Sequence, residues 1–473
     1  MDKIRMRTNA GSIKLRVTTK DGSPCELWNG GKKIAELQSD NWENIAVQNN
    51  AEEIIIKGYD IQELGCDNNQ LTALNASGCT RLQVLYCSYN QLTTLNVNGC
   101  TSLQWLDCSN NQLTTLNASG CTSLQWLYCD NNKLISLDVS GCTSLQELYC
   151  NNNQLTTLNV NGCTSLQWLD CSNNQLTTLN ASGCTSLQVL YCYYNQLTAL
   201  NVSGLTSLQK LDCSNNQLTA LNASGCTSLR LLYCPNNQLT ALNASGCTSL
   251  QKLYCFNNQL TSLAVSGLTS LQWLDCANNQ LTTLNVNGCT SLQVLYCNNN
   301  QLTTLNVNGC TSLRLLYCPN NQLTALDASG CTSLQKLYCY DNRLTALNAS
   351  GLVNLEDIDC YENDLTELNV RNCRALQRLN CSFNRLAALD ASGCTSLQKL
   401  YCNNNKLTAE AFKKIFEDLP ERKEKGGGVL LYKDGDSNYK DFSQPPELVA
   451  AFKQAKAKGW RLYKINNDDL MEL

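Results

Sequence analysis

Apolar and polar positions recur with a fixed period of 21 residues from residue 61 to residue 407. The unit from Leu103 to Ser123 reads LQWLDCSNNQLTTLNASGCTS, with leucine at its first, fourth, eleventh and fourteenth positions, cysteine at its sixth and asparagine at its ninth. The asparagine recurs without insertion or deletion in seventeen units, at positions 69, 90, 111, 132, 153, 174, 195, 216, 237, 258, 279, 300, 321, 342, 363, 384 and 405. A period this short predicts a solenoid, in which each unit packs on its neighbours.

Each unit predicts one strand and one return segment. Apolar and varied residues alternate over the first seven positions, which favours a strand, and stacking the units gives a parallel inner sheet of about 17 strands. The second half of the unit is rich in Thr, Asn, Ser and Gly, which disfavour helix, so we expect short extended or 3₁₀ segments on the convex side. The repeated asparagine is expected to turn the chain and to hydrogen-bond the backbone of adjoining units.

The flanking segments do not follow the repeat. Residues 1–60 carry short alternating runs at 4–8, 12–18, 33–37 and 52–58, separated by turn residues, and predict a small β-rich N-terminal cap with Trp28 and Trp42 in its core. Residues 408–473 predict an α/β C-terminal cap. It would contain a helix capped by Thr408, a strand at 429–432, a helix from Pro446 to about Lys458 and a strand at 460–465.

Thirty-one cysteines would suggest a disulfide scaffold if they were scattered, but all except Cys25 form two columns, of seventeen and thirteen residues. One column lies three residues before the repeated asparagine. The other lies ten residues after it, where Leu205, Leu268 and Leu352 replace cysteine in some units. A position that accepts Cys or Leu is an apolar packing position. We therefore expect buried, reduced thiols, and the absence of paired CxxC clusters argues against zinc.

Composition excludes several function classes. The chain has 35 basic and 39 acidic residues, a net charge of −4 and no histidine. Nothing in this balance favours nucleic acid or an anionic membrane, and no apolar run is long enough to insert into one. Without a histidine, a nucleophile–base pair or a phosphate-binding loop, the sequence predicts a protein that is not an enzyme, with no catalytic residues, no metal and no cofactor.

Three positions of the unit vary freely while the others hardly change. They are the third, fifth and seventh, which share the outward, concave face of the strand. Exposed Trp and Tyr are typical interface anchors. We therefore predict that this face binds a partner, through Trp105, Trp126, Tyr128, Tyr149, Trp168, Tyr191, Tyr193, Trp273, Lys336, Arg378 and Lys399.

Three interpretations of this face stay open. The first is protein–protein recognition, with the aromatic residues as anchors and the charged C-terminal units setting the orientation. The second is glycan binding, because a row of flat aromatic rings can stack on sugar rings. The third is a structural spacer, in which stacked Tyr side chains only stabilise adjacent strands.

The repeat LxxLxCxxNxLxxL, with its cysteine column, resembles the repeats of the bacterial internalin J group. It is also similar to those of surface leucine-rich-repeat proteins of Bacteroidetes, and residues such as LGCDNNQLTALN at 64–75 and TAEAFKKIFEDLP at 408–420 add to this likeness. The resemblance implies a mainly β leucine-rich-repeat solenoid that acts as an adhesin- or receptor-like binder. Its partner would be a protein, for example of a host or a cell surface, and the chain itself would be a monomer.

The resemblance also implies a bacterial surface or secreted location. The first residues, MDKIRMRTNAGSIKLRV, have no apolar core of signal-peptide length. We therefore expect either a cytoplasmic protein or one whose leader is not part of this sequence.

Overall fold

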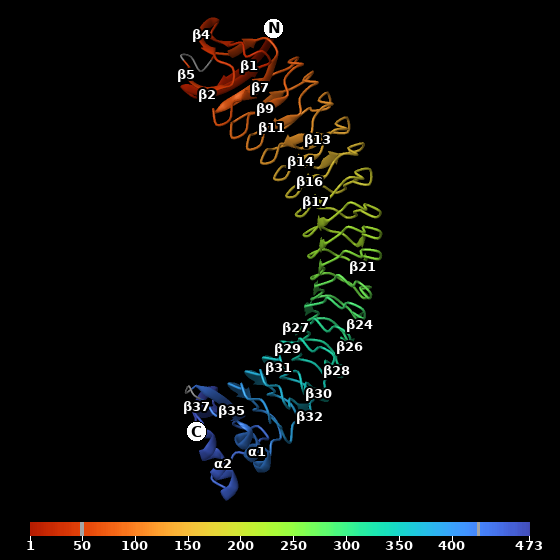
Figure 1. Cartoon of the computed structure of the whole chain (residues 1–473), viewed down its shortest axis with the longest axis vertical. Coiled ribbons are helices and arrows are strands. Elements are labelled where there is room, and N and C mark those ends of the chain that lie inside the picture. Colours follow the sequence, from red (N-terminus) through yellow and green to blue (C-terminus); the bar gives the residue numbers. More distant parts are fainter. Residues whose placement is uncertain (48–51, 423–425) are drawn as a thin grey trace. The chain divides into compact units, whose positions relative to one another are not determined.

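The computed structural model describes residues 1–47, 52–422 and 426–473. The chain forms two compact units, Met1–Gln238 and Leu239–Leu473, and each is described here by itself. Nearly all of its regular structure is β, and two helices are found in the described residues, α1 (Ala409–Asp418) and α2 (Pro446–Ala457) (Figure 1). The fold is therefore a mainly β solenoid, as the repeat predicts.

A parallel sheet runs along each unit, as expected. Each strand pairs in register with the equivalent residues one repeat away, so that Trp105 lies between Val84 and Trp126. In the first unit the strands are β7 (Ile61–Gly65), β9 (Val84–Tyr86), β11 (Trp105–Asp107), β12 (Trp126–Tyr128), β14 (Glu147–Tyr149), β16 (Trp168–Asp170), β17 (Val189–Tyr191), β18 (Lys210–Asp212) and β20 (Leu231–Tyr233). In the second unit they are β22 (Lys252–Tyr254), β23 (Trp273–Asp275), β25 (Val294–Tyr296), β27 (Leu315–Tyr317), β29 (Lys336–Tyr338), β31 (Asp357–Asp359), β33 (Arg378–Asn380) and β34 (Lys399–Tyr401).

The return side of the repeats is extended. Its short strands are β8 (Leu71–Asn75), β10 (Thr94–Asn96), β13 (Ser136–Asp138), β15 (Thr157–Asn159) and β19 (Ala220–Asn222) in the first unit, and β21 (Ala241–Asn243), β24 (Thr283–Asn285), β26 (Thr304–Asn306), β28 (Ala325–Asp327), β30 (Ala346–Asn348) and β32 (Glu367–Asn369) in the second. No 3₁₀ turn occurs in the described residues, so of the two predicted conformations only the extended one is found.

The repeated asparagine ties each repeat to the one before it, as predicted. The side-chain oxygen of Asn111 accepts a hydrogen bond from the backbone N–H of Leu92 at 2.9 Å. Its amide nitrogen donates to the carbonyls of Cys87, Cys108 and Ser109 at 3.0–3.1 Å. The amide therefore satisfies backbone groups at the turn that strand pairing leaves without partners.

Both cysteine columns lie in the core and are reduced, as expected. All 31 cysteines are buried, and their thiols are reduced. In the second column the thiol of Cys100 donates to the carbonyl of Ala76 at 3.2 Å, so the sulfur also satisfies a backbone acceptor of the preceding repeat. The leucines of each repeat fill the rest of the space between the sheet and the return side.

Antiparallel strands close the N-terminal end of the first unit. They are β1 (Asp2–Thr8), β2 (Ser12–Thr19), β3 (Cys25–Asn29), β4 (Lys32–Leu37), β5 (Asn41–Ala46) and β6 (Ile54–Gly58). Strand β2 pairs with β7 of the parallel sheet, and β1 pairs with β8 of the return side. The prediction that Trp42 belongs to the core is wrong, because this side chain is 44% exposed. Trp28 is half-buried.

The C-terminal segment extends the parallel sheet. Strand β35 (Gly427–Lys433) pairs in parallel with β34, and β36 (Trp460–Asn466) pairs in parallel with β35. A last strand, β37 (Asp469–Glu472), is antiparallel to β36. Helix α1 begins at the predicted cap, where the Thr408 hydroxyl accepts a hydrogen bond from the N–H of Ala411 at 3.1 Å. The two helices occupy the place of the return segments in this part of the chain (Figure 1).

Candidate functional site: the outward face of the parallel sheet

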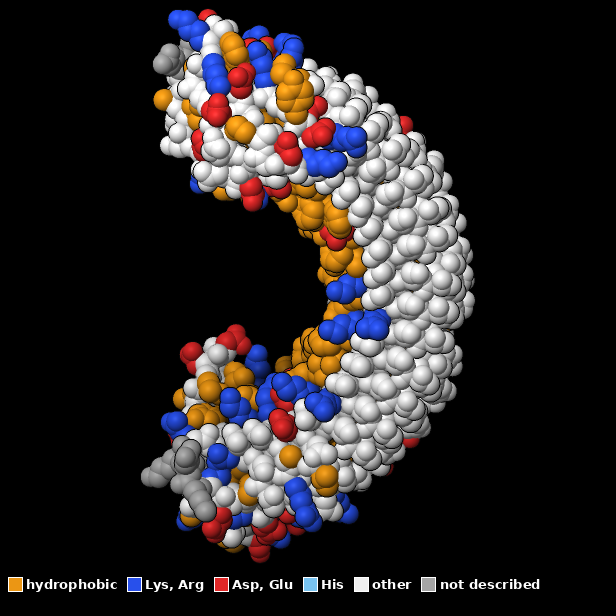
Figure 2. Space-filling view, turned by 45° about the horizontal axis from the view of Figure 1, so that its top comes forward, with side chains coloured by type: hydrophobic (Ala, Val, Ile, Leu, Met, Phe, Trp, Pro, Cys, Tyr) orange, Lys and Arg blue, Asp and Glu red, His pale blue; other side chains and the backbone are white. Residues whose placement is uncertain are grey.

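The outward side chains of each strand occupy the third, fifth and seventh positions of the repeat, and we call this surface the sheet face. A three-residue strand such as β11 points Leu106 into the core and leaves Trp105 and Asp107 half-buried on the sheet face. In Figure 2 hydrophobic side chains follow this face in each unit, whereas the return side is almost entirely uncharged and polar. The sheet face therefore carries most of the chemical variety of the repeats.

Aromatic side chains form a continuous row on the sheet face of the first unit. The ring centroids of Trp105 and Trp126 are 5.1 Å apart, and those of Tyr128 and Tyr149 are 4.9 Å apart. Contacts of 4.9–6.4 Å link successive members from one end to the other. We call this row the first aromatic ladder, and its members are Tyr86, Trp105, Trp126, Tyr128, Tyr149, Trp168, Tyr191, Tyr193 and, at the eighth position just beyond the sheet face, Tyr194.

Packing within the ladder partly covers its rings. The rings of Trp168 and Tyr191 meet at 88°, in the edge-to-face arrangement that the ring quadrupoles favour. The indole N–H groups of Trp105 and Trp168 are buried and have no hydrogen-bond partner among the described residues. The ladder thus contributes to stability, and it also presents a large apolar surface at which few polar groups need to be desolvated.

A residue outside the repeats also covers part of the sheet face, at the first repeat. At the fifth position of the first repeat stands Gly65, where most other repeats carry Tyr or Asp. A Cβ atom at this glycine would lie 2.8 Å from the ring of Trp42, so that ring occupies the space of the missing side chain. Sequence reasoning missed this placement, although the lone glycine in a column of large residues is a signal for it.

Carboxylates accompany the aromatic ladder. The hydroxyl of Tyr128 donates a hydrogen bond to Glu147 at 3.0 Å, and burial together with this carboxylate raises the pKa of Tyr128. Asp170 accepts hydrogen bonds from the hydroxyl and the N–H of Ser172 at 2.6 and 3.0 Å. Burial nevertheless raises the pKa of Asp170 above its ordinary value. The carboxylates on this face are therefore partly desolvated.

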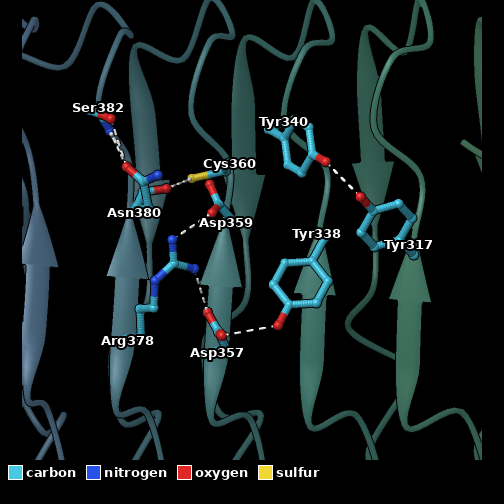
Figure 3. A network of polar contacts seen from close by, with 9 residues as sticks. All are labelled: Tyr317, Tyr338, Tyr340, Asp357, Asp359, Cys360, Arg378, Asn380 and Ser382. Carbon is cyan, nitrogen blue, oxygen red and sulfur yellow. Dashed lines mark hydrogen bonds and ion pairs between the residues drawn. The ribbon is translucent and has the colours of Figure 1, made fainter. Parts of the chain in front are cut away.

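The second unit carries a ladder of its own with a different polar network. Its members include Tyr254, Trp273, Tyr296, Tyr317, Tyr338, Tyr340 and Tyr361. The hydroxyls of Tyr317 and Tyr340 are 2.6 Å apart, and the hydroxyl of Tyr338 donates a hydrogen bond to Asp357 at 3.0 Å. Figure 3 draws both contacts. Here the tyrosine hydroxyls are held by one another and by a carboxylate.

Arg378 crosslinks two carboxylates in this network. Its guanidinium forms ion pairs with Asp357 at 3.0 Å and with Asp359 at 2.8 Å (Figure 3). It also lies over the ring of Tyr401, with 5.6 Å between the guanidinium carbon and the ring centroid. The ion pairs raise the pKa of Arg378, whereas burial opposes that change. The charge of Arg378 is therefore already neutralised by carboxylates of the same chain.

The structure brings together only part of the predicted binding set. Seven of the predicted residues belong to the first aromatic ladder, namely Trp105, Trp126, Tyr128, Tyr149, Trp168, Tyr191 and Tyr193. Trp273, Lys336, Arg378 and Lys399 lie on the sheet face of the second unit, where Lys336 and Lys399 are exposed. Tyr86 and Tyr194 extend the first ladder beyond the predicted set.

The described residues contain no group of three or more acidic or cysteine side chains arranged to hold a metal ion. None of the helices found in the described parts of the chain has the length and apolar character needed to cross a membrane.

A cavity of about 770 Å³ lies on the return side of the second unit and is lined partly by Arg371, Asp390 and Lys414. The cavity is thus separate from the sheet face.

Comparison with known proteins places the repeats in a family. A model described as "Leucine Rich repeats (2 copies)" matches residues 122–162, 164–205, 185–226, 206–246, 227–269, 269–310, 311–349 and 374–414. A second model, described as "Leucine Rich Repeat", matches residues 102–124. None of the curated proteins with which the chain was compared matches it.

Several solved structures are similar to the chain. The functional domain of InlJ from Listeria monocytogenes, which includes a cysteine ladder, is 30% identical with a TM-score of 0.54, and the match covers 80% of this chain and 73% of that one. A leucine-rich repeat protein from Leptospira interrogans is 27% identical with a TM-score of 0.51, covering 72% and 88% of the two chains. YopM from Yersinia enterocolitica, at 24% identity and a TM-score of 0.50, covers 80% and 88% and shares the fold.

The repeats of 21 residues, the two columns of buried cysteines and the asparagine at every turn agree with these matches. The chain therefore belongs to the leucine-rich repeat family, with a cysteine ladder like that of InlJ.

Proposed function

We propose that the chain is a non-enzymatic recognition protein that binds a protein partner through the sheet face. The observation that carries this proposal is the first aromatic ladder, in which Trp and Tyr side chains contact one another without a break from Tyr86 to Tyr194. Large aromatic residues that are rigid and partly desolvated before binding are the usual anchors of protein interfaces.

The scaffold under the ladder supports this proposal. The strands are joined by in-register pairing, and each turn is fixed by an asparagine such as Asn132, which bonds the carbonyls of Cys108 and Cys129. Side chains on such a scaffold lose little conformational freedom when a partner binds. Variation restricted to the outward positions then changes the binding surface and leaves the core packing unchanged.

Affinity capture with three matched baits tests the proposal. The baits are the natural chain, a triple variant Trp105→Ser/Trp126→Ser/Trp168→Ser, and a return-side variant Thr115→Ala/Thr157→Ala/Thr178→Ala whose altered residues are exposed. Circular dichroism and thermal unfolding first establish that all three baits are folded. We expect that some protein binds both the natural chain and the threonine variant. The same protein should not bind the tryptophan variant.

Two results would contradict the proposal. Identical protein lists from the natural chain and the tryptophan variant would remove the ladder as the binding surface and leave a spacer role. A glycan array probed with the same three baits covers the other interpretation. A glycan that binds the natural chain and not the tryptophan variant, in the absence of any such protein, would replace protein recognition with glycan recognition.

A further inference from the structure

Charge on the sheet face of the first unit is one-sided from β9 to β17, and the next strand, β18, begins with the exposed Lys210. From Leu82 to Gln209 the sequence contains a single basic residue, Lys133. Lys133 follows the repeated asparagine and lies outside the three positions that form the sheet face, where its amino group is 3.5 Å from the side-chain oxygen of Gln112. The same stretch places four carboxylates on the sheet face, at Asp107, Asp130, Glu147 and Asp170.

Only neutral groups bond these carboxylates. Asp107 and Asp170 accept hydrogen bonds from the serine two residues further on, Asp130 accepts one from an asparagine, and Glu147 accepts one from Tyr128. None of the four forms an ion pair within the described parts of the chain. Burial raises the pKa of Asp130, and the charges of Asp107 and Asp170 raise it further. The ionised face therefore lacks a compensating cation.

The chain itself shows how a cation fits at the edge of this face. Arg16 of the extended strand β2 forms an ion pair with Glu63, the carboxylate of the first repeat, at 2.9 Å. Lys14 of the same strand lies 5.3 Å from the ring centroid of Trp42, which covers the sheet face at Gly65. Basic side chains of β2, the strand that pairs with β7, thus already lie beside the carboxylate and the aromatic ring of the first repeat, and the carboxylates of the next repeats have no such neighbour in the described residues.

We infer that the sheet face of the first unit binds an extended, arginine-rich segment of the protein partner, with guanidinium groups on the carboxylates and against the aromatic ladder. This inference rests on the proposed function and specifies the partner. Arginine fits better than lysine, because its planar guanidinium pairs with carboxylates and also packs on aromatic rings. From Tyr86 to Tyr191 the ladder crosses five strand intervals of about 4.8 Å, or about 24 Å in all, which matches seven or eight extended residues.

The sheet face of the second unit differs from that of the first in its charge. It carries Lys252, Lys336 and Lys399, and two of its carboxylates, Asp357 and Asp359, already form ion pairs with Arg378. A cationic segment would find there fewer carboxylates without a partner and several like charges. The first unit therefore fits such a segment better.

Fluorescence anisotropy of the full chain tests this inference. The probe is a fluorescein-labelled peptide of alternating glycine and arginine, about eight residues long to match the ladder. Matched peptides with lysine or with glutamate in place of arginine serve as comparisons. The variants are Asp107→Asn/Asp170→Asn, which keeps side-chain shape and the serine hydrogen bonds, and the control Asp138→Asn, which removes a carboxylate from β13 on the return side.

We expect the arginine peptide to bind the natural chain and the control alike, and to bind the double variant about tenfold more weakly. Affinity for the lysine peptide should be lower and that for the glutamate peptide undetectable. Raising the salt concentration should weaken binding to the natural chain more than binding to the double variant. Equal affinity of the natural chain and the double variant would overturn the inference, and so would equal competition by spermidine, a small polycation.

The two proposals fail in different ways. Suppose that a captured protein binds Asp107→Asn/Asp170→Asn but not the tryptophan variant. Protein recognition then stands, and the inference that the partner segment is cationic is wrong. If the arginine peptide binds the tryptophan variant as tightly as the natural chain, the ladder takes no part in binding the cationic segment and the further inference is overturned, while the capture experiment still decides the proposed function.

Discussion

At the scale of the residue, one repeated position shows where backbone strain is tolerated. The residue before each repeated asparagine has a positive φ near 50–56°, a conformation that asparagine adopts more readily than other residues with side chains. Most repeats place asparagine there, as at Asn110, but Tyr89, Tyr194 and Phe383 are large aromatic residues with the same φ, and they are 61%, 57% and 47% exposed. Tyr194 packs on Tyr193 at the end of the first aromatic ladder, with 5.9 Å between the ring centroids. Tyr89 and Phe383 are only partly buried, and nothing in the described residues explains their choice over asparagine.

The partly buried carboxylates of the sheet face lead to a prediction about pH. Burial raises the pKa of Asp170 above its ordinary value of about 3.9, so the folded chain holds this proton more tightly than the unfolded chain. The favourable contribution of the protonated group is complete below the unfolded pKa and is lost as pH rises through the folded pKa. Ionised Asp170 therefore lowers the free energy of unfolding at neutral pH.

We expect Asp170→Asn to unfold at a temperature a few degrees higher than the natural chain at pH 7. The difference should shrink towards zero as pH falls through the unfolded pKa of about 3.9, because the aspartate is then protonated in both states. Thermal unfolding followed by circular dichroism at a series of pH values measures this. Asp138→Asn is the control and should behave oppositely, because hydrogen bonds from Ser140 lower the pKa of Asp138. A constant difference at all pH values would contradict the explanation.

At the scale of the element, the asparagine ladder continues into the C-terminal segment. Asn438 accepts a hydrogen bond from the N–H of Leu407 at 2.9 Å and donates to the carbonyls of Cys402 and Leu431 at 2.9 and 2.8 Å. These are the contacts that the repeated asparagines make in the repeats. Asn438 lies 33 residues after Asn405, because α1 replaces the return segment between them. The C-terminal segment therefore joins the solenoid by the same device as the repeats.

We expect Asn438→Ala to destabilise the second unit by about 2–4 kcal/mol, because it leaves a buried N–H and two carbonyls without partners. Urea unfolding gives the loss, and hydrogen exchange should show it first in the amides of β34, β35 and α1. The exposed Asn348 bonds only the next turn, through Ser350, so Asn348→Ala is the matched control and should cost less than about 0.5 kcal/mol. Equal losses in the two variants would show that Asn438 is not a continuation of the ladder.

At the scale of the whole molecule, the rate at which the buried cysteines react measures how far the repeats have unfolded. The reactive form is the thiolate, and burial raises the pKa of Cys100 to about 12 and that of Cys121 to about 11. All 31 cysteines are buried, so the surrounding side chains shield every thiol from a reagent in solution. A repeat must open before its cysteines react.

We therefore expect iodoacetamide at pH 8 to label almost no cysteine of the native chain, and to label all 31 after unfolding in urea. Mass spectrometry counts the labels, and intermediate denaturant concentrations should label the two units in groups of neighbouring repeats, since each repeat depends on those beside it. Rapid labelling of a subset of cysteines in the native chain would contradict this expectation. Leu205, Leu268 and Leu352, which replace cysteine at the second column, leave their repeats with one label fewer.

The amino-acid sequence by itself determined the repeat, the strand at its start, the asparagine at its turn and the burial of its cysteines. These features are local and recur at one fixed period, so stacking identical units admits only one register. It also indicated which positions face outward, because they are the ones that vary. Helix starts are also local features, so Thr408 as a capping residue and Pro446 as a first helical residue predicted where the two C-terminal helices begin.

Only the tertiary structure decided what happens where the period breaks or where side chains from distant segments meet. Trp42 covers Gly65 because β5 and β7 both pair with β2, and Asn438 completes a turn because α1 is inserted before it. Arg378 is neutralised because the in-register sheet places Asp357 beside it. The contacts of Trp42 and Asn438 join segments that the period does not relate, whereas Arg378 and Asp357 are one period apart and become partners only because the sheet is parallel and in register. A sequence pattern contains none of these distances in space.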